Sequence, residues 1–256
     1  MQGINFSLPG LRDKRVLMTG GSTGIGREIV RAFARQYAQV TFLDIDEAGA
    51  QATIAACLAD EAREPTFVHC DLTKVAELEA TIKTNAQKNG STQILVNNAA
   101  NDDRHAWGDI TSDYWDGRIA VNLRHVFFAT QAVLPAMKAA GQGCIINMGS
   151  DTPGLGLGGM PIYSAAKAAI AGLTRSTAKE FGAFGIRVNS VIPGAIATER
   201  QKQLWYTPET VAEIQAAQCI KGEIAPSDVA NMVVFLASDA AAMCTAQSYT
   251  VDAGWL

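Results

Sequence analysis

The stretch RVLMTGGSTGIGREIVRAFARQ, residues 15–36, decides the fold predicted for this chain. Residues 15–20 are mostly apolar and predict a buried strand, and residues 25–36 carry the periodic pattern of an amphipathic helix. The glycine-rich turn between them lets backbone N–H groups approach a phosphate at a helix N-terminus. Its spacing is G-x-x-x-G-x-G rather than the commoner G-x-G-x-x-G. A turn that binds nothing is the alternative, but the strand–turn–helix context favours a dinucleotide site.

Further apolar runs predict strands along the rest of the chain. They lack the alternation of a strand with one solvated face, so they indicate a parallel sheet buried on both faces. Helical stretches separate them, the longest at about residues 113–138. We predict an α/β fold in one domain, residues 1–256: a doubly wound (Rossmann), mostly parallel seven-stranded sheet flanked by helices, with a substrate lid at about 199–222. The further strand runs are residues 39–44, 66–71, 93–98, 143–149, 186–194 and 247–255.

Composition excludes several classes of function. The net charge of −4 carries no basic excess, so neither nucleic acid nor an anionic membrane is an expected partner. No apolar run reaches the ~18 residues of a membrane span, and the N-terminus lacks the apolar region of a signal peptide. Five cysteines, odd in number and without a C-x-x-C pair, are typical of small core residues in a reducing compartment. We therefore expect a cytoplasmic protein.

The end of the second predicted strand bears on the choice of cofactor. Asp44 follows Gly26 by 18 positions, where a carboxylate can accept both hydroxyls of an adenosine ribose. It would repel a 2′-phosphate by about 4 kcal/mol at 4 Å and an effective dielectric near 20. Neither Ile45 nor Ile25 offers a compensating cation. The sequence predicts NAD rather than NADP. Asp71, at the end of the third strand, has two open interpretations, a contact with adenine or a cap for the following helix.

A tyrosine and a lysine lie four residues apart in the helical segment YSAAK. Tyr163 and Lys167 therefore share one helix face, and Ser150 ends the preceding strand. A free phenol titrates near 10, so a tyrosine base needs its pKa lowered by two or three units. A nearby ammonium supplies about that much at moderate dielectric. An ordinary pair on an exposed helix is the alternative for the motif alone.

These motifs together resemble the short-chain dehydrogenase/reductase family over nearly the whole chain. The matching residues are Thr19-Gly20-x-x-x-Gly24-x-Gly26, Asn97-Asn98-Ala99, Asn122, Ser150, Tyr163-x-x-x-Lys167 and Pro193-Gly194. Two positions depart from the family pattern, Ala100 and Gly149, where glycine and serine are common. Neither change removes a group that the family's chemistry needs.

The resemblance implies roles for the matching residues. Tyr163 would take the proton of the substrate hydroxyl, Lys167 would lower the pKa of Tyr163 and bind the nicotinamide ribose, and Ser150 would orient the substrate oxygen. Asn122 would hold a water that links Lys167 to solvent. A hydride would pass from the substrate carbon to the nicotinamide. The expected cofactor-binding residues, besides Tyr163 and Lys167, are Gly20, Ser22, Thr23, Gly24, Ile25, Gly26, Asp44, Asp71, Leu72, Asn98, Ala99, Pro193, Gly194, Ile196 and Thr198.

Four further segments resemble the bacterial aldose 1-dehydrogenases of this family. They are NDDRH at 101–105, YWDGRIAVNLRH at 114–125, the 199–222 region and FLASDAAAMCTAQSYTVDAGW at 235–255. Relatives of this kind act on D-xylose, L-arabinose, D-galactose or L-fucose and oxidise the anomeric hydroxyl to the aldonolactone. The resemblance implies the same reaction here. A reductase or dehydrogenase for another secondary alcohol or a 3-ketoacyl substrate is the second hypothesis, and a non-catalytic cofactor-binding sensor is the third.

A sugar pocket needs several hydrogen-bonding groups and an aromatic platform. Residues 101–105 can supply the hydrogen-bonding groups, and Trp205 or Tyr206 can supply the platform. We expect one of Asp102 and Asp103 to face the sugar and the other to bond Arg104 or solvent. A metal site is disfavoured because a tyrosine mechanism needs no Lewis acid. The expected substrate residues are Asn101, Asp102, His105, Ser150, Asp151, Tyr163 and Trp205. The sequence does not choose among pentoses and hexoses.

The helix that carries Tyr163 is rich in Ala and Gly on more than one face. Small residues allow close helix–helix contact, and such helices form subunit interfaces in the family. We expect a homotetramer, with a dimer as the alternative.

Overall fold

One parallel sheet organises the molecule. The computed structural model describes residues 7–256. Seven strands lie in the order β3-β2-β1-β4-β5-β6-β7, and every neighbouring pair is parallel. The predicted doubly wound, seven-stranded sheet is therefore confirmed. The strands are β1 (Arg15–Thr19), β2 (Gln39–Asp44), β3 (Thr66–His69), β4 (Ile94–Asn97), β5 (Gly143–Met148), β6 (Ile186–Pro193) and β7 (Ser248–Val251).

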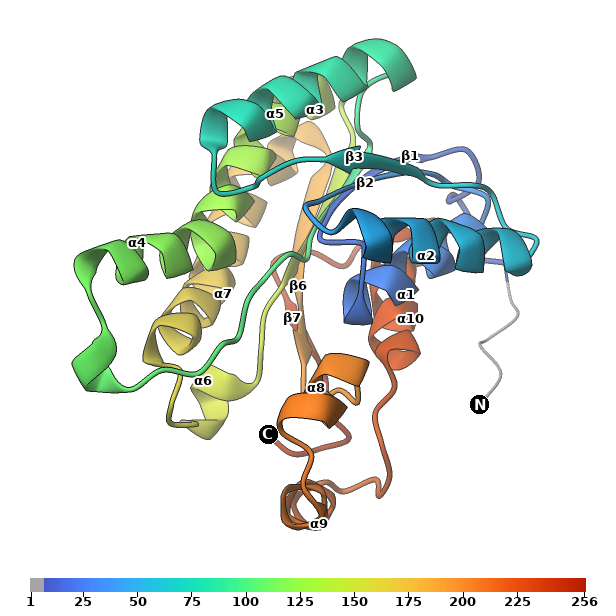
Figure 1. The fold of residues 1–256 in the computed structure, drawn as a ribbon. Helices are drawn as coiled ribbons and strands as arrows, with labels where there is room; N and C mark the ends of the chain where they lie inside the picture. Colours follow the sequence, from blue (N-terminus) through green and yellow to red (C-terminus); the bar gives the residue numbers. More distant parts are fainter. Residues whose placement is uncertain (1–6) are drawn as a thin grey trace.

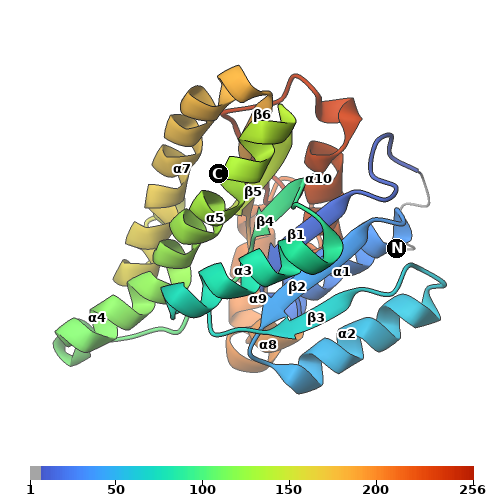
Figure 2. The same cartoon turned by 90° about the horizontal axis from the view of Figure 1, so that it is seen from above.

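Helices cover both faces of the sheet, as Figures 1 and 2 show. α1, α2 and α10 pack on one face, and α3, α5 and α7 pack on the other. The α-helices are α1 (Gly24–Arg35), α2 (Glu47–Ala59), α3 (Val75–Asn89), α4 (Ser112–Ile119), α5 (His125–Ala140), α6 (Thr152–Leu155), α7 (Pro161–Phe181), α8 (Glu199–Leu204), α9 (Pro208–Ala217) and α10 (Pro226–Ala237). Short helical segments are η1 (Trp107–Asp109), η2 (Ala120–Arg124), η3 (Gly182–Phe184) and η4 (Asp239–Ala241).

The strands bury side chains on both faces because successive residues point in opposite directions. In β1, Val16 and Met18 belong to the apolar cluster beneath α1 and α10, whereas Leu17 belongs to the cluster beneath α3, α5 and α7. In β4, Val96 and Leu95 divide in the same way. This explains why the strand runs of the sequence are apolar without alternation.

The strand order reverses between β1 and β4, so the carboxyl ends of these strands open a crevice. Thr19 pairs in register with Asn97, which pairs with Asn147. The Asn97 amide donates to Asn147 Oδ1 at 2.9 Å, and the Asn147 amide donates to Thr174 Oγ1 at 3.0 Å. This buried polar ladder ties the centre of the sheet to α7 below the crevice.

The structure divides the helix predicted at about 113–138. It forms α4, a π-helical segment η2 and α5 in succession. A π-helical turn often marks a functional position, and η2 contains Asn122. The region predicted as a lid forms α8 and α9, which lie beyond the carboxyl end of β6 (Figure 1).

The cysteines depart in part from their prediction. Cys57, Cys70 and Cys144 are buried, but Cys219 is exposed and Cys244 is half-buried. The prediction of five core cysteines is wrong for these two because they lie in loops near the surface. All five are free thiols. Within residues 7–256 no helix is both long and apolar enough to span a membrane.

Candidate active site

The turn between β1 and α1 is shaped for an anion. Gly20 and Gly24 adopt left-handed φ angles of 74° and 54°. A Cβ on Gly26 would lie 1.8 Å from the carbonyl oxygen of Gly20, so only glycine fits there. Thr23 begins α1 without a side-chain hydrogen bond to the first turn. The N–H groups at this helix start therefore remain available to a phosphate.

Asp44 brings the end of β2 to this turn. Its Oδ2 accepts from the backbone N–H of Ser22 at 3.0 Å, and its Oδ1 accepts from the N–H of Ile45 at 2.8 Å. Ser22 is buried, and its hydroxyl donates to the carbonyl of Asp46 at 2.9 Å. The carboxylate is thus held beside the glycine-rich turn, and its contact with an adenosine ribose stays a prediction.

Asp71 closes the turn before α3. Its Oδ1 accepts from the backbone N–H and the hydroxyl of Thr73 at 3.0 and 2.6 Å, and these bonds hold the pKa of Asp71 below its usual value. The neighbouring Leu72 is buried. The side chain therefore stabilises the turn before α3. It is not the N-cap of that helix, because Lys74 occupies the N-cap position. Contacts of Asp71 and Leu72 with adenine stay predictions.

The ends of β1 and β4 are joined by side chains. Thr19 Oγ1 accepts from the N–H groups of Asn98 and Ala99 at 3.1 and 3.2 Å. The Asn98 amide donates to the Gly20 carbonyl at 2.5 Å. A Cβ on Gly20 would lie 2.7 Å from the Cα of Ala99. The two segments predicted to hold the cofactor are therefore in direct contact.

Tyr163, Lys167 and Ser150 line one cavity. Lys167 is buried, and its Nζ donates to the Met148 carbonyl at 2.7 Å and lies 5.6 Å from the centre of the Tyr163 ring. Ser150 follows β5, and its hydroxyl lies 2.8 Å from that of Thr152. The structure brings these predicted residues together from one helix and one strand end.

The electrostatics of the pair differ from the expected direction. Burial raises the pKa of Tyr163 above its ordinary value, a hydrogen bond with Ser150 lowers it, and the carboxylates of Asp102 and Asp151 raise it. Burial lowers the pKa of Lys167 to about 8, and the charge of Asp102 opposes that change. The chain's own groups thus hold Tyr163 in the protonated form, and negative charge near the phenol disfavours its ionisation.

Asn122 occupies the π-helical segment and is fully buried. Its Oδ1 accepts from the N–H of Asn101 at 2.8 Å, and its Nδ2 donates to the carbonyls of Asn101 and Arg118 at 3.1 and 2.9 Å. The side chain therefore braces the loop after β4 and does not line the cavity. Its predicted role in holding a water stays a prediction.

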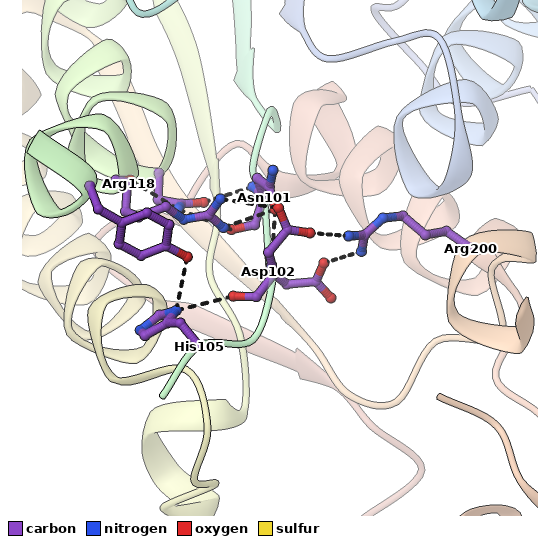
Figure 3. A network of polar contacts seen from close by, with 8 residues as sticks. Asn101, Asp102, His105, Arg118 and Arg200 are labelled. Carbon is purple, nitrogen blue, oxygen red and sulfur yellow. Dashed lines mark hydrogen bonds and ion pairs between the residues drawn. The ribbon is translucent and has the colours of Figure 1, made fainter. Parts of the chain in front are cut away.

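Two residues of the loop after β4, Asn101 and His105, were predicted to contact the substrate but point elsewhere. The Asn101 side-chain oxygen accepts from Arg118 at 2.8 Å, and His105 Nδ1 lies 3.2 Å from the hydroxyl of Tyr114 (Figure 3). Neither residue lines the cavity. The structure therefore does not place Asn101 and His105 where a substrate would lie, because their polar atoms bond the α4 side of the loop.

The two consecutive carboxylates do not separate as expected, one toward the sugar and one toward Arg104 or solvent, because both pair with Arg200. Asp102 lines the cavity, and its Oδ2 accepts from Gln201 at 2.5 Å. Asp103 pairs with Arg118 at 3.3 Å, and Arg200 pairs with both carboxylates (Figure 3). Arg104, the expected partner, instead lies over the Trp205 ring at 4.0 Å from its centre. The loop is thus linked to α8 by charge and stacking.

Asp151 lies deep in the same cavity. It is buried, and burial together with the nearby Asp252 raises the pKa of Asp151 to about 6. The carboxylate of Asp252 is itself occupied, since it accepts from the N–H groups of Gly254, Trp255 and Leu256 at 2.8, 3.0 and 2.7 Å. Asp151 is therefore a carboxyl group that can accept a hydrogen bond, or donate one when protonated.

The cavity runs from the start of α1 to α8 and α9 and has a volume of about 450 Å³, within the usual range for a small-molecule site. No three His, Cys, Asp or Glu side chains of the described residues cluster as a metal site would need. Predicted residues that line the cavity are Ile25, Asn98, Asp102, Ser150, Asp151, Tyr163, Lys167, Pro193, Gly194, Ile196, Thr198 and Trp205.

Several residues at the site were missed by the sequence analysis. Arg118 and Arg200 organise the loop, and Gln201 and Trp255 line the cavity. Tyr206, predicted beside Trp205 as an alternative aromatic platform, also lines the cavity. The mixed polar and aromatic composition of residues 199–222 was a signal for a lid. The pairing of Arg200 with residues about a hundred positions earlier had no signal in the sequence.

Comparisons with known proteins agree with this geometry. A family described as enoyl-(acyl carrier protein) reductase matches residues 20–256. The chain is 51% identical to D-xylose 1-dehydrogenase of Caulobacter vibrioides, covering 96% of this chain and 97% of that protein. It is 45% identical to the "Probable galactose dehydrogenase GalD" of Rhizobium meliloti, covering 96% of each.

Solved structures share the fold. The 3-oxoacyl-[acyl-carrier protein] reductase of Brucella melitensis superposes with a TM-score of 0.89 at 27% identity, covering 100% of both chains. A dehydrogenase/reductase of Sinorhizobium meliloti superposes with a TM-score of 0.85 at 30% identity, covering 97% of this chain and 96% of that one.

Proposed function

This chain belongs to the short-chain dehydrogenase/reductase family, and we propose that it oxidises the anomeric hydroxyl of an aldose to the aldonolactone with NAD. One observation carries the proposal: the cavity that holds Tyr163 and Ser150 also presents Asp102, Asp151 and Trp205. A polyol needs hydrogen-bonding groups on its edges and accepts an aromatic face beside its C–H groups. Asp102 already has Arg200 and Gln201 as partners, but an apolar acyl or steroid substrate would offer no hydrogen bond to the buried Asp151, which is costly.

The names of the similar proteins support the same substrate class. Two relatives at 51% and 45% identity are named for D-xylose and galactose. A pentose and a hexose both occur among them, so the choice of sugar depends on the shape of the cavity in this chain. The lid helices contribute Gln201, Trp205 and Tyr206 to that shape.

Members of this family use a nicotinamide cofactor, and the glycine turn suits its pyrophosphate. Gly20, Gly24 and Gly26 leave space for it, and Ser22, Thr23 and Ile25 complete the turn. We assign NAD because Asp44 would meet a 2′-phosphate with negative charge. The bound nicotinamide supplies the hydride acceptor at the reacting carbon.

The chain's own residues handle the proton. Tyr163 takes the proton of the anomeric hydroxyl, and Ser150 orients the substrate oxygen. Lys167, held by the Met148 carbonyl at 2.7 Å, keeps a positive charge beside the phenol. Because burial raises the pKa of Tyr163, this charge is needed to stabilise the phenolate. Asn122 keeps the loop after β4 in place and holds the water that the family resemblance implies.

The proposal also includes the oligomeric state and the cellular compartment. Ala165, Ala168, Ala169 and Gly172 are exposed along α7, and such a small-residue face suits close contact with a second copy, so we retain a homotetramer as part of the proposal. Five free cysteines suit a reducing compartment such as the cytoplasm. Light scattering that found only the 27.1 kDa monomer would contradict the assembly.

The test is a panel of aldoses, each offered with NAD and with NADP, with lactone formation as the readout. D-xylose, L-arabinose, D-galactose and L-fucose are the first substrates. We expect turnover of at least one with NAD and a much lower kcat/KM with NADP. Activity confined to 3-ketoacyl substrates or apolar alcohols would contradict the proposal in favour of a different reductase.

A further inference from the structure

The lid helix α8 is attached to the loop after β4 through one arginine. Arg200 pairs with both Asp102 and Asp103 (Figure 3). Two contacts support the pairing: the Gln201 amide donates to Asp102, and Arg104 stacks on Trp205 at the end of α8. These links join residues separated by about a hundred positions in sequence, so they report how closely α8 lies over the cavity.

Asp102 also faces the reacting groups from the other side. It lines the cavity with Tyr163 and Lys167, and its charge raises the pKa of both. A phenolate at Tyr163 is therefore disfavoured by Asp102 unless something compensates that charge. In this structure Asp102 pairs with Arg200 and accepts a hydrogen bond from Gln201, and both partners belong to α8.

We propose that Arg200 is a positioning residue that couples closure of α8 to proton abstraction at Tyr163 by neutralising Asp102. The inference rests on the proposed function, since it assumes that Tyr163 takes the substrate proton. It adds a role for a residue that touches neither the substrate nor Tyr163. With α8 raised, Asp102 would carry an uncompensated charge and hold Tyr163 protonated.

The attachment is suited to opening and closing. The Arg200 side chain is 45% exposed, and exposed ion pairs contribute little net stability. The ends of the lid are fixed by a bridge between Ile196 and Ile224, where the N–H of Ala197 donates to the Ile224 carbonyl at 2.9 Å. The N–H groups of Cys219 and Ile220 also donate to the Ala253 carbonyl at 2.9 and 3.0 Å, so the part of this segment that carries α8 and α9 lies between two backbone attachments.

A second series of contacts connects α8 to α4 and η2. Asp103 is shared between Arg200 and Arg118, and the buried Arg118 also bonds the side chain of Asn101. Asn101 in turn bonds Asn122 through its backbone. The lid is thus connected to the segment that carries Asn122, and Asp103 is the junction.

Other charged groups facing the phenol do not substitute for Arg200. Lys167 lies on the same helix as Tyr163, Asp151 follows β5 with Asp252 behind it, and Arg104 and Glu213 line the cavity from the loop and α9. Of the two arginines near the cavity mouth, Arg104 lies over Trp205. Only Arg200 is paired with Asp102 in the described part of the chain.

The primary test is the pH profile of kcat/KM for Arg200→Gln, Asp102→Asn and the double variant. Arg200→Gln leaves the charge of Asp102 uncompensated, so the rising limb moves to higher pH by about one unit. Asp102→Asn moves it to lower pH. In the double variant Arg200→Gln has no further effect, because no charge remains to neutralise. Arg200→Lys retains the cation and stays near wild type.

The matched control is Lys202→Gln on the same helix. Lys202 pairs with Glu223 at 2.9 Å and does not line the cavity, so its profile should not move. A profile unchanged in Arg200→Gln would overturn the inference. So would a shift of equal size in the Asp102→Asn background, because Arg200 would then act directly on Tyr163.

A substrate-free measurement separates this inference from the proposed function. With NAD present, each protein is titrated with base while the absorbance of phenolate is recorded. The same titration of its Tyr163→Phe counterpart is subtracted, and the difference reports the ionisation of Tyr163. Arg200→Gln should raise the titration midpoint and increase hydrogen exchange across residues 199–206. If no aldose is oxidised but these shifts occur, the proposed function fails and the coupling stands. If aldoses are oxidised and neither shift occurs, the coupling fails alone.

Discussion

The cofactor side and the substrate side of the crevice are built in different ways. The cofactor side uses backbone: the turn from Gly20 to Gly26 and strand ends joined by Thr19. The substrate side uses charged and aromatic side chains from three separate segments, the loop after β4, the start of the Ser150 loop and α8. Backbone sites tolerate few substitutions, whereas side-chain sites can change specificity one residue at a time.

The two sides also differ in how firmly they are held. On the cofactor side, a Cβ at Gly26 would overlap the Gly20 carbonyl at 1.8 Å. On the substrate side, the Arg200 contacts are half-exposed and can be released. If the proposed function is correct, binding of the cofactor depends on the sheet edge, whereas recognition of the sugar depends on the position of α8. Four substitutions test that division.

The largest effect is expected for Tyr163→Phe, which stands at the boundary of the two sides. Removing the phenol oxygen removes the base, so kcat should fall by about 10³-fold or more. The ring remains, so the NADH dissociation constant, measured by fluorescence titration, should change less than threefold. Substantial turnover would contradict the role of Tyr163, and lost cofactor binding would show that the two sides are not separable.

A large change in cofactor choice is expected for Asp44→Asn. Removing the charge removes the repulsion of a 2′-phosphate, so the ratio of kcat/KM for NAD over NADP should fall by about 100-fold. The KM for sugar should not change. Glu47→Gln, an exposed carboxylate at the start of α2, is the matched control. An unchanged ratio would show that Asp44 does not determine the choice between NAD and NADP.

A pH-dependent change in stability is expected for Asp151→Asn. Because burial raises the pKa of Asp151 to about 6 in the folded state, above its usual value of 3.8, the ionised carboxylate destabilises the fold above pH 6. That cost is lost as the pH falls through 6 toward 4. The asparagine variant should be more stable than wild type at pH 7.5, by about 3 kcal/mol at most, with the difference vanishing near pH 4.

Urea unfolding at the two pH values measures this difference. Asp109→Asn, where the carboxylate is exposed, serves as the control and should show no such dependence. A gap between Asp151→Asn and wild type that is the same at both pH values would show that Asp151 is not held in a raised-pKa environment. The substrate side would then lack a carboxyl that changes protonation near neutral pH.

The smallest effect is expected for Trp205→Ala at the end of α8. Loss of the aromatic platform and of its stack with Arg104 should raise the KM for sugar by about tenfold, with the KM for NAD changed less than twofold. Trp115→Ala, on exposed α4 and outside the cavity, is the matched control. Equal changes in both KM values would mean that the lid serves both sides.

The sequence signals for the cofactor side are local, and the contacts they predict with a cofactor stay predictions. The glycine turn, Asp44 and the four-residue spacing of Tyr163 and Lys167 each lie within one strand–turn–helix unit or one helix. Local spacing determines which atoms meet there. Of the residues predicted for the substrate side, Asp102 and Trp205 line the cavity, but Asn101 and His105 bond the α4 side of the loop.

The sequence by itself determined the parallel sheet, the glycine-rich turn and the shared helix face of Tyr163 and Lys167, because periodicity and short spacing are sufficient for these. Only the tertiary structure decided that Arg200 meets Asp102, that Arg118 holds Asn101 and that Asp252 lies near Asp151. Each of these depends on how loops at the carboxyl edge of the sheet come together. Charges far apart in sequence interact only after the strand order has placed them, so no local pattern foretells their partners.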